Sequence, residues 1–240
     1  MYYSPFRLMK LCRSRAIELF FSSPEPPLYR MSVRVIIPFK PRNPKTRLSG
    51  VMSLAERETL AEMMLRDVID AVTDADCTPI ILSTAPYCLT GIETVVHAGG
   101  LNEALNEILP KAEGPTLIIM SDLPLVTPAN VTEMVTTRAR MAMVPGRGGG
   151  TNAIFLPNPS GFHTDFYGAS FLKHLEIAGD LGLSVEIIDS FRLHDDIDEV
   201  EDLVEILTLG SGATRRYLER LGFVLSTEEG RVGVKRHPHE

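Results

Sequence analysis

Short apolar runs alternate along the chain with longer stretches in which apolar residues recur every three or four positions. An apolar run bounded by turn residues is typical of a strand, and recurrence near 3.6 positions is typical of a helix that buries one face. The expected strands cover residues 33–37, 79–83, 94–97, 116–120, 141–144, 153–156 and 185–188. The expected helices cover residues 54–72, 100–109, 168–178, 199–208 and 212–221, with another beginning at residue 128.

Local signals mark where several of these helices begin. Ser53 with Glu56 has the spacing of a capping box, and Asp198 with Glu201 has a similar pattern. Thr127 precedes a proline, as is common at a helix start. Strands that alternate with helices predict a three-layer α/β/α sandwich around a mostly parallel sheet. The uninterrupted apolar run at 116–120 fits a central strand that is covered on both faces.

Composition narrows the class of protein without identifying it. The 240 residues carry a net charge of −7, and 44% of them are hydrophobic, as in ordinary globular proteins. The acidic balance disfavours a nucleic-acid binder, and no apolar run approaches the ~20 residues that span a bilayer. Three cysteines without a CxxC pair indicate neither a disulfide framework nor a zinc site. We therefore expect a reduced, cytoplasmic protein that binds neither nucleic acid nor membrane.

The first thirty residues differ from the rest of the chain. Residues 1–30 carry a net charge of +3 and end in a stretch rich in serine and proline, whereas residues 31–240 carry −10. We expect residues 1–30 to be a leader or tail outside the folded domain; a short docking helix and a targeting peptide are alternatives. Residues 31–240 are expected to form a single domain.

Four of the scarce cations follow the first expected strand directly. Lys40, Arg42, Lys45 and Arg47 lie within eight positions, on a loop that also holds three prolines. Proline restricts the backbone, so these cations could be held where a polyanion such as a triphosphate arrives. A solvated basic loop is the alternative. The chain has no GxxxxGK[ST] motif, and its glycine run at 146–150 does not open a helix, so neither a P-loop nor a dinucleotide fingerprint is indicated.

Acidic residues follow two other expected strands. Asp122 comes just after the run 116–120, where ligands of such sheets bind, and a turn-capping role is the alternative. Asp196 and Asp198 alternate along an extended segment, so both could reach one ion, although Asp198 also fits a helix cap. Carboxylates that share an ion with phosphate oxygens are typical of Mg²⁺ sites.

Two small-residue turns are candidate binding segments. Thr151 and Asn152 follow a glycine run and could hydrogen-bond an anionic acceptor or a base, or the run could be a flexible turn. Ser170, with Tyr167 and Gly168 before it, opens an expected helix, where backbone N–H groups can bind phosphate or carboxylate. A plain helix cap is the alternative for Ser170.

Taken in order, these motifs resemble a known family. The chain has PxK and KxRL after its first strand, then SDLP, GGTN, a glycine and serine turn followed by SF, and DID-x-x-EDL. This order resembles the 2-phospho-L-lactate guanylyltransferase family over nearly all of residues 33–210. The resemblance implies a nucleotide-diphospho-sugar transferase (GT-A-like) fold. It also implies transfer of GMP from GTP to 2-phospho-L-lactate, with release of pyrophosphate, in biosynthesis of coenzyme F-420 of methanogenic archaea and some bacteria.

The resemblance also implies roles for individual residues. Lys40, Lys45 and Arg47 would bind the triphosphate and, with Asp122, form the catalytic set. Mg²⁺ would be bound by Asp122, Asp196 and Asp198. The acceptor would be bound by Thr151, Asn152, Tyr167, Gly168 and Ser170, although the turn reads FYGAS where the family pattern is FGxGS.

Several alternatives stay open at this point. Related enzymes use phosphoenolpyruvate or a phosphoglycerate as acceptor, and other nucleotidyltransferases of the same fold, including molybdenum-cofactor guanylyltransferases, are close rivals. A regulatory module that binds nucleotide without chemistry is an alternative of another class. Residues 223–225 and 231–234 could form a hairpin that pairs across a homodimer.

Overall fold

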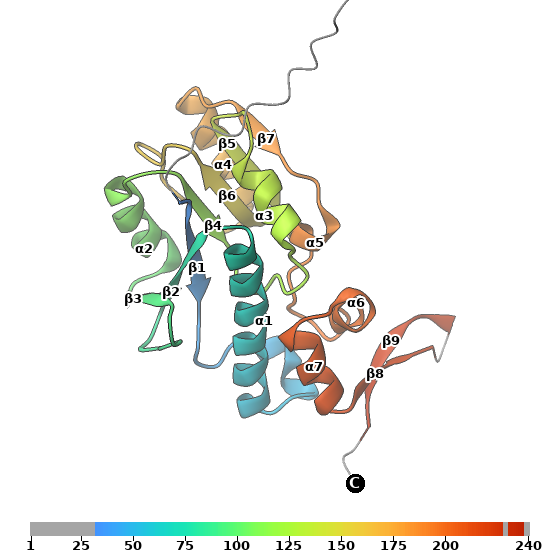
Figure 1. Ribbon diagram of the computed structural model, residues 1–240. Helices are drawn as coiled ribbons and strands as arrows, with labels where there is room; N and C mark the ends of the chain where they lie inside the picture. Colours follow the sequence, from blue (N-terminus) through green and yellow to red (C-terminus); the bar gives the residue numbers. More distant parts are fainter. Residues whose placement is uncertain (1–31, 228–229, 238–240) are drawn as a thin grey trace, which may run out of the picture.

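The computed structural model describes residues 32–227 and 230–237 and centres on a seven-stranded sheet (Figure 1). The strands lie in the order β3-β2-β1-β4-β6-β5-β7. β6 runs antiparallel to both of its neighbours, and the other strand pairs are parallel, which confirms a mostly parallel sheet. The strands are β1 Arg34–Phe39, β2 Thr78–Ser83, β3 Glu93–Val96, β4 Thr116–Ile119, β5 Met141–Pro145, β6 Thr151–Leu156 and β7 Val185–Ile187.

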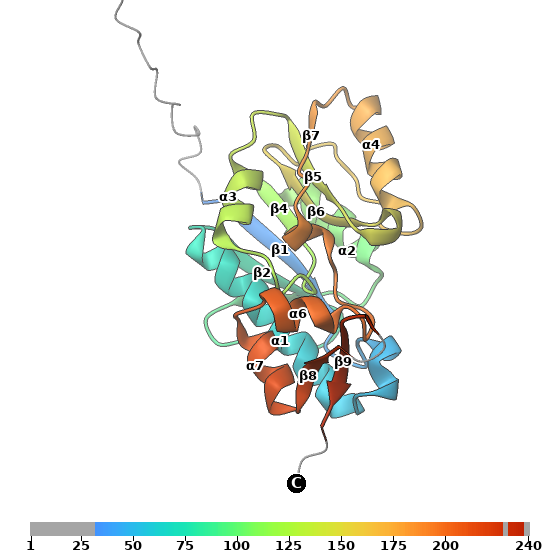
Figure 2. The same cartoon turned by 90° about the vertical axis from the view of Figure 1, so that its right-hand side faces the viewer.

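Helices cover both faces of this sheet, which confirms the three-layer sandwich (Figures 1 and 2). One face packs against α1 Leu54–Asp74, α3 Pro128–Val135, α5 Phe191–His194, α6 Leu203–Leu209 and α7 Ala213–Arg220. The other face packs against α2 Leu101–Ile108 and α4 Ser170–Asp180. Adjacent strand residues divide between the two cores: Val35 and Ile37 face the first, and Ile36 faces the second. The described residues also include short 3₁₀ helices: η1 Thr46–Gly50, η2 Leu109–Lys111 and η3 Arg147–Gly149.

Two of the three predicted helix starts are confirmed. The Ser53 hydroxyl accepts from the Glu56 backbone N–H at 3.3 Å, and the Glu56 carboxylate accepts from the Ser53 N–H at 2.8 Å. Thr127 caps α3 in the same way. The capping box predicted at Asp198 is wrong, because α6 begins only at Leu203. The Asp202 carboxylate accepts from the backbone N–H groups of residues 198 and 199, which holds this segment as a turn before the helix.

The chain after α7 forms the predicted hairpin. Strands β8 Phe223–Ser226 and β9 Gly233–Arg236 pair antiparallel and lie beside α6 and α7 (Figure 1). Arg236 forms an ion pair with Glu56 at the start of α1, so the hairpin is tied to its own chain. Its pairing across a homodimer stays a prediction.

Two predictions about the whole chain have different outcomes. The leader predicted at residues 1–30 lies outside the described residues. None of the helices within residues 32–227 and 230–237 combines the length and apolar character needed to cross a bilayer.

Candidate active site

Residues from three strands of the sheet meet at one edge. β1 leads into Lys40, and β4 is followed closely by Asp122. β6 is antiparallel to β4, so its first residues, Thr151 and Asn152, lie at the edge where β1 and β4 end. The glycine run predicts a turn at Thr151 and Asn152, whereas the structure includes both residues in the strand.

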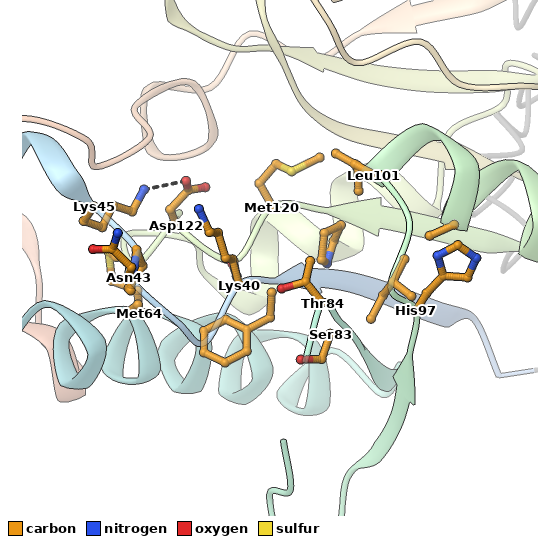
Figure 3. A pocket seen from close by; sticks show the side chains of 18 of the residues that line it. Lys40, Asn43, Lys45, Met64, Ser83, Thr84, His97, Leu101, Met120 and Asp122 are labelled. Carbon is orange, nitrogen blue, oxygen red and sulfur yellow. Dashed lines mark hydrogen bonds and ion pairs between the residues drawn. The ribbon is translucent and has the colours of Figure 1, made fainter. Parts of the chain in front are cut away.

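A cavity of about 340 Å³ opens at this edge (Figure 3). Its walls come from the cationic loop after β1, the segments after β2 and β3, the start of α2 and the segment after β4. Lys40 and Lys45 line the same cavity as Asp122 and Asp198, so the structure brings together four of the predicted site residues. Exposed Lys40 projects beside Asp122 and Met120 in Figure 3.

Lys45 joins two of the predicted metal ligands. Its Nζ lies 2.7 Å from Asp122 Oδ2 and 2.7 Å from Asp198 Oδ1, although the two aspartates are 76 positions apart in the sequence. Burial disfavours the charged ammonium, but the charges of both carboxylates outweigh burial and raise the pKa of Lys45. Lys45 thus places one positive charge between two carboxylates at the mouth of the cavity.

The backbone around Lys45 adopts an uncommon conformation. Asn43 and Lys45 both have positive φ, at 46° and 48°, on either side of Pro44. The buried Arg57 guanidinium of α1 donates to the Asn43 side chain at 3.2 Å and to the Pro44 carbonyl. The Asn43 N–H donates to the Glu58 carboxylate at 3.1 Å. α1 therefore holds the loop in the conformation that directs Lys45 toward the carboxylates.

Arg47 lies at the rim of this cluster. Its Nη1 is 3.4 Å from Asp198 Oδ2 and 3.6 Å from Glu199 Oε1, and 65% of its side chain is exposed. Burial favours the neutral form of Asp198, yet Lys45 and Arg47 outweigh it and lower the pKa of this carboxyl. Asp198 therefore favours its ionised form.

Asp196 has different surroundings. No cation forms an ion pair with it in residues 32–227 and 230–237, and its Oδ1 lies 3.4 Å from the side-chain Nδ2 of Asn152. Burial and the charge of Asp122 raise the pKa of Asp196. Asn152 Nδ2 also donates to the backbone carbonyls of Leu193 and His194, at 2.9 and 3.0 Å. The side chain of Asn152, predicted to bind substrate, thus holds the acidic segment, residues 195–202, in place.

Thr151 and Ser170 contact each other in a buried network. Their hydroxyl oxygens lie 3.0 Å apart, and Thr151 Oγ1 is also 3.0 Å from His174 Nδ1. His174 Nε2 accepts from the backbone N–H of Asp165 at 2.9 Å, so the ring carries its proton on Nδ1 and donates it to Thr151. The network ties the start of β6 to the start of α4 at the site edge.

Tyr167 and Gly168 form the exposed turn in front of α4. Gly168 has φ of 68°, a conformation that favours glycine, and the Tyr167 ring is largely exposed. A Cβ on Gly100 would lie 3.0 Å from the Tyr167 hydroxyl, so the turn approaches the cavity wall at the start of α2. The structure thus places the predicted acceptor turn next to the cavity.

The far wall of the cavity is not predicted from the sequence. Ser83, Thr84, His97, Gly99 and Gly100 line it, at the ends of β2 and β3 and the start of α2 (Figure 3). The same strand-end rule that identified Lys40 and Asp122 applies to these residues, but they carry no charged motif. His97 Nδ1 accepts from the Gly99 N–H at 3.1 Å, so this histidine helps to hold the backbone of the far wall in place.

The fold, together with the site at the carboxyl ends of β1 and β4, indicates a class of enzyme. Cations and carboxylates surround a cavity at the carboxyl ends of the strands, where ligands of α/β sheets bind, and such charges suit an enzyme that stabilises charge on a phosphoryl group, such as a nucleotidyltransferase. The fold is similar to that of a solved structure from Desulfovibrio desulfuricans G20 assigned to the nucleotide-diphospho-sugar transferases. The TM-score is 0.65 and the identity is 18%, over 79% of this chain and 95% of that chain.

The chain belongs to the family described as "Guanylyl transferase CofC like", whose match covers residues 33–237. Its relatives include the 2-phospho-L-lactate guanylyltransferase of Methanoregula boonei, which is 54% identical over 86% of this chain and 96% of that protein. The 2-phospho-L-lactate guanylyltransferase of Methanosphaerula palustris is 50% identical over 86% of this chain and 99% of that protein. The resemblance to this family and the assignment as a nucleotidyltransferase are confirmed.

Proposed function

We propose that this protein transfers the guanylyl group of GTP to 2-phospho-L-lactate, in biosynthesis of coenzyme F-420. A phosphate oxygen of the acceptor attacks the α-phosphorus of GTP, and the bond from that phosphorus to the bridging oxygen breaks. Pyrophosphate leaves with the bonding electron pair, and lactyl-2-diphospho-guanosine forms. The reaction needs no oxidant or reductant.

One observation carries this proposal. Lys45 meets Asp122 and Asp198 at the mouth of a cavity at the strand-end edge, so positive and negative groups for a triphosphate and its counter-ion lie together. The relatives named as guanylyltransferases support GTP as the donor. The cavity between this cluster and the far wall is the proposed place for the nucleoside.

The proposed chemistry depends on position and charge. The acceptor phosphate is already ionised, so no residue has to remove a proton from it. Lys40, Lys45 and Arg47 would contact the triphosphate and neutralise charge that builds up on the leaving pyrophosphate. Asp122 would act with them by holding the metal ion near the α-phosphate. The proposed acceptor contacts come from Thr151, Asn152, Tyr167, Gly168 and Ser170.

The carboxylates fit Mg²⁺ in their chemistry. Asp122, Asp196 and Asp198 offer the hard oxygen ligands that Mg²⁺ prefers. Burial and, after it, repulsion from Asp122 raise the pKa of Asp196, and a bound cation would relieve the repulsion. Among the described residues no three His, Cys, Asp or Glu side chains already stand as a metal site, and Lys45 lies between two of the proposed ligands. When bound, Mg²⁺ would supply charge neutralisation at the α-phosphoryl group.

Release of pyrophosphate tests this function directly. The protein is incubated with GTP, Mg²⁺ and 2-phospho-L-lactate, and pyrophosphate is measured by a coupled assay. We expect release that requires all three components. Absence of pyrophosphate with 2-phospho-L-lactate, phosphoenolpyruvate and phosphoglycerate would refute the guanylyltransferase function.

Two further arms separate the alternatives. Release with phosphoenolpyruvate or phosphoglycerate but not with phospholactate would keep the reaction and change the acceptor. Faster release with CTP or ATP than with GTP would assign another donor. Tight GTP binding without pyrophosphate release from any acceptor would favour a regulatory module.

A further inference from the structure

The aspartates of the acidic segment before α6 fall into two groups according to their contacts. Asp198 lines the cavity, where Lys45 contacts it, and Asp196 contacts Asn152 beside it. Asp195 and Asp202 are only 5% and 4% exposed and turn away from that group. Nothing in the proposed reaction uses these two buried carboxylates, so their partner has to be found elsewhere.

That partner is Arg147. Its Nε lies 3.2 Å from Asp195 Oδ1, and its Nη2 forms an ion pair with Asp202 Oδ1. Nη2 also donates to the backbone carbonyl of Asp196 at 3.1 Å. One guanidinium therefore binds the segment at three residues, two through side chains and one through the backbone.

Asp202 extends this contact along the segment. Its Oδ2 accepts from the backbone N–H groups of Asp198 and Glu199, both at 2.8 Å, while its Oδ1 pairs with Arg147. Arg147 and Asp202 together thus bind the backbone at 196, 198 and 199. The carboxylates of Asp196 and Asp198 project from a backbone that this pair holds on both sides of Ile197.

Arg147 itself comes from the glycine-rich turn between β5 and β6. Gly148 and Gly149 have φ of 68° and 83°, so the turn needs glycine after the arginine. A Cβ on Gly149 would lie 3.9 Å from the Cβ of Ala169, which directly precedes α4. The same turn therefore reaches the acidic segment on one side and the proposed acceptor turn on the other.

We propose that Arg147 is a positioning residue that holds Asp196 and Asp198 in place for a divalent cation. This inference rests on the metal ligands given in the proposed function. Arg147 does not touch the cation and acts through Asp195, Asp202 and the backbone. Groups that orient metal ligands in this way typically change metal affinity by about 10- to 100-fold when they are removed.

The sign of the effect separates positioning from simple charge. Arg147 is a cation near a cation site, so its charge alone opposes metal binding, and its removal would then tighten binding. Positioning predicts the opposite, because without the guanidinium the segment loses three contacts and its carboxylates spread. A single affinity measurement therefore distinguishes the two.

The test is an Mn²⁺ titration of the full chain without nucleotide, followed by the EPR signal of the free ion. We expect Arg147→Met to weaken Mn²⁺ binding at least tenfold. Arg147→Lys keeps the charge but loses the forked geometry, so we expect it to weaken binding by a smaller factor. Arg140→Met is the matched control, because it removes an exposed arginine at the opposite end of β5 and should leave Mn²⁺ affinity unchanged.

The outcomes are decisive even if one variant is unstable. Thermal unfolding shows whether Arg147→Met is folded, and Arg147→Lys carries the test if it is not. Equal or tighter Mn²⁺ binding in a folded Arg147 variant would overturn the inference, as would a wild-type protein that binds no Mn²⁺. The Mn²⁺ titration uses no GTP, so it is independent of the activity assay. If Arg147→Met weakens Mn²⁺ binding but the wild type releases no pyrophosphate with any of the three acceptors, the proposed function is refuted and the inference stands.

Discussion

Stability toward acid should depend on His174, the histidine in the buried network between β6 and α4. The ring is fully buried, with the Phe166 ring centroid 4.8 Å away. Burial lowers the pKa of His174 from 6.5 to about 4, and the positive charges of His163 and Lys173 act in the same direction against Asp165. Both ring nitrogens already have partners that suit the neutral form. Protonation would break the bond from the Asp165 N–H.

The sign and size of the effect follow from this shift. The folded state holds His174 neutral, whereas in the unfolded chain it protonates near pH 6.5. The stabilisation is therefore fully present above pH 6.5 and is lost as the pH falls from 6.5 toward about 4. The full shift corresponds to about 3 kcal/mol, and about 2 kcal/mol of it should be lost between pH 7 and pH 5.

Urea unfolding at pH 7 and pH 5 measures this loss. His174→Gln cannot protonate and keeps an amide oxygen that can accept from the Asp165 N–H. We expect the free energy of unfolding of the wild type to fall by about 2 kcal/mol more than that of the variant between these pH values. The exposed His163→Gln is the matched control: it removes only a minor cause of the His174 shift and leaves that ring and its contacts in place, so its loss of stability should stay close to that of the wild type.

The contributions of the other titrating groups cancel when the wild type is compared with the variant. Burial raises the pKa of Asp195 and Asp196, so their effect on stability as the pH falls is opposite to that of His174. Arg236 lowers the pKa of Glu56 to about 2. All three are present in the wild type and in both variants. If the wild type and His174→Gln lose the same stability between pH 7 and pH 5, the burial argument for His174 is wrong.

Three further substitutions test the cavity mouth. Asp122→Asn should lower the rate of pyrophosphate release at least tenfold with little change in the unfolding temperature; a large loss of stability with normal turnover would favour a turn-capping role. Lys45→Met should tighten Mn²⁺ binding, because it frees two carboxylates, and should abolish turnover; unchanged Mn²⁺ affinity would contradict the position of its ammonium between them. Arg57→Met should raise the KM for GTP and destabilise the fold by about 2 kcal/mol, because Asn43 and Pro44 lose a buried donor. An unaltered KM in folded Arg57→Met would show that the loop holds its shape without this contact.

The strands were predictable because their apolar runs are local signals. Residues 116–120 and 79–83 correspond closely to β4 and β2, and the Ser53 box marks the start of α1. The direction of a strand is not a local signal. β6 runs antiparallel, so Thr151 and Asn152 turned out to lie inside a strand at the site edge, a position that only the pairing with β4 reveals.

The site was predictable as a list of charged residues at strand ends, but its pairings were not. Asp198 and Glu201 have the spacing of a capping box, yet Asp202 takes the backbone N–H groups because Arg147 holds the other oxygen of that carboxylate. Arg147 lies 55 positions before Asp202. A local pattern cannot choose between neighbouring acidic residues when the choice is made by a partner so far away in the chain.

The pairings also explain how so many carboxylates share one edge of an acidic protein. Lys45 forms ion pairs with Asp122 and Asp198, and Arg147 forms ion pairs with Asp195 and Asp202. Asp196 lies between the two sets, and in the described part of the chain it has no ion pair of its own. Burial and the nearby Asp122 charge raise its pKa, so the repulsion that the two cations leave unrelieved falls on Asp196. The divalent cation that we propose would relieve this repulsion by binding there, and Lys45 would then be free to contact the proposed triphosphate.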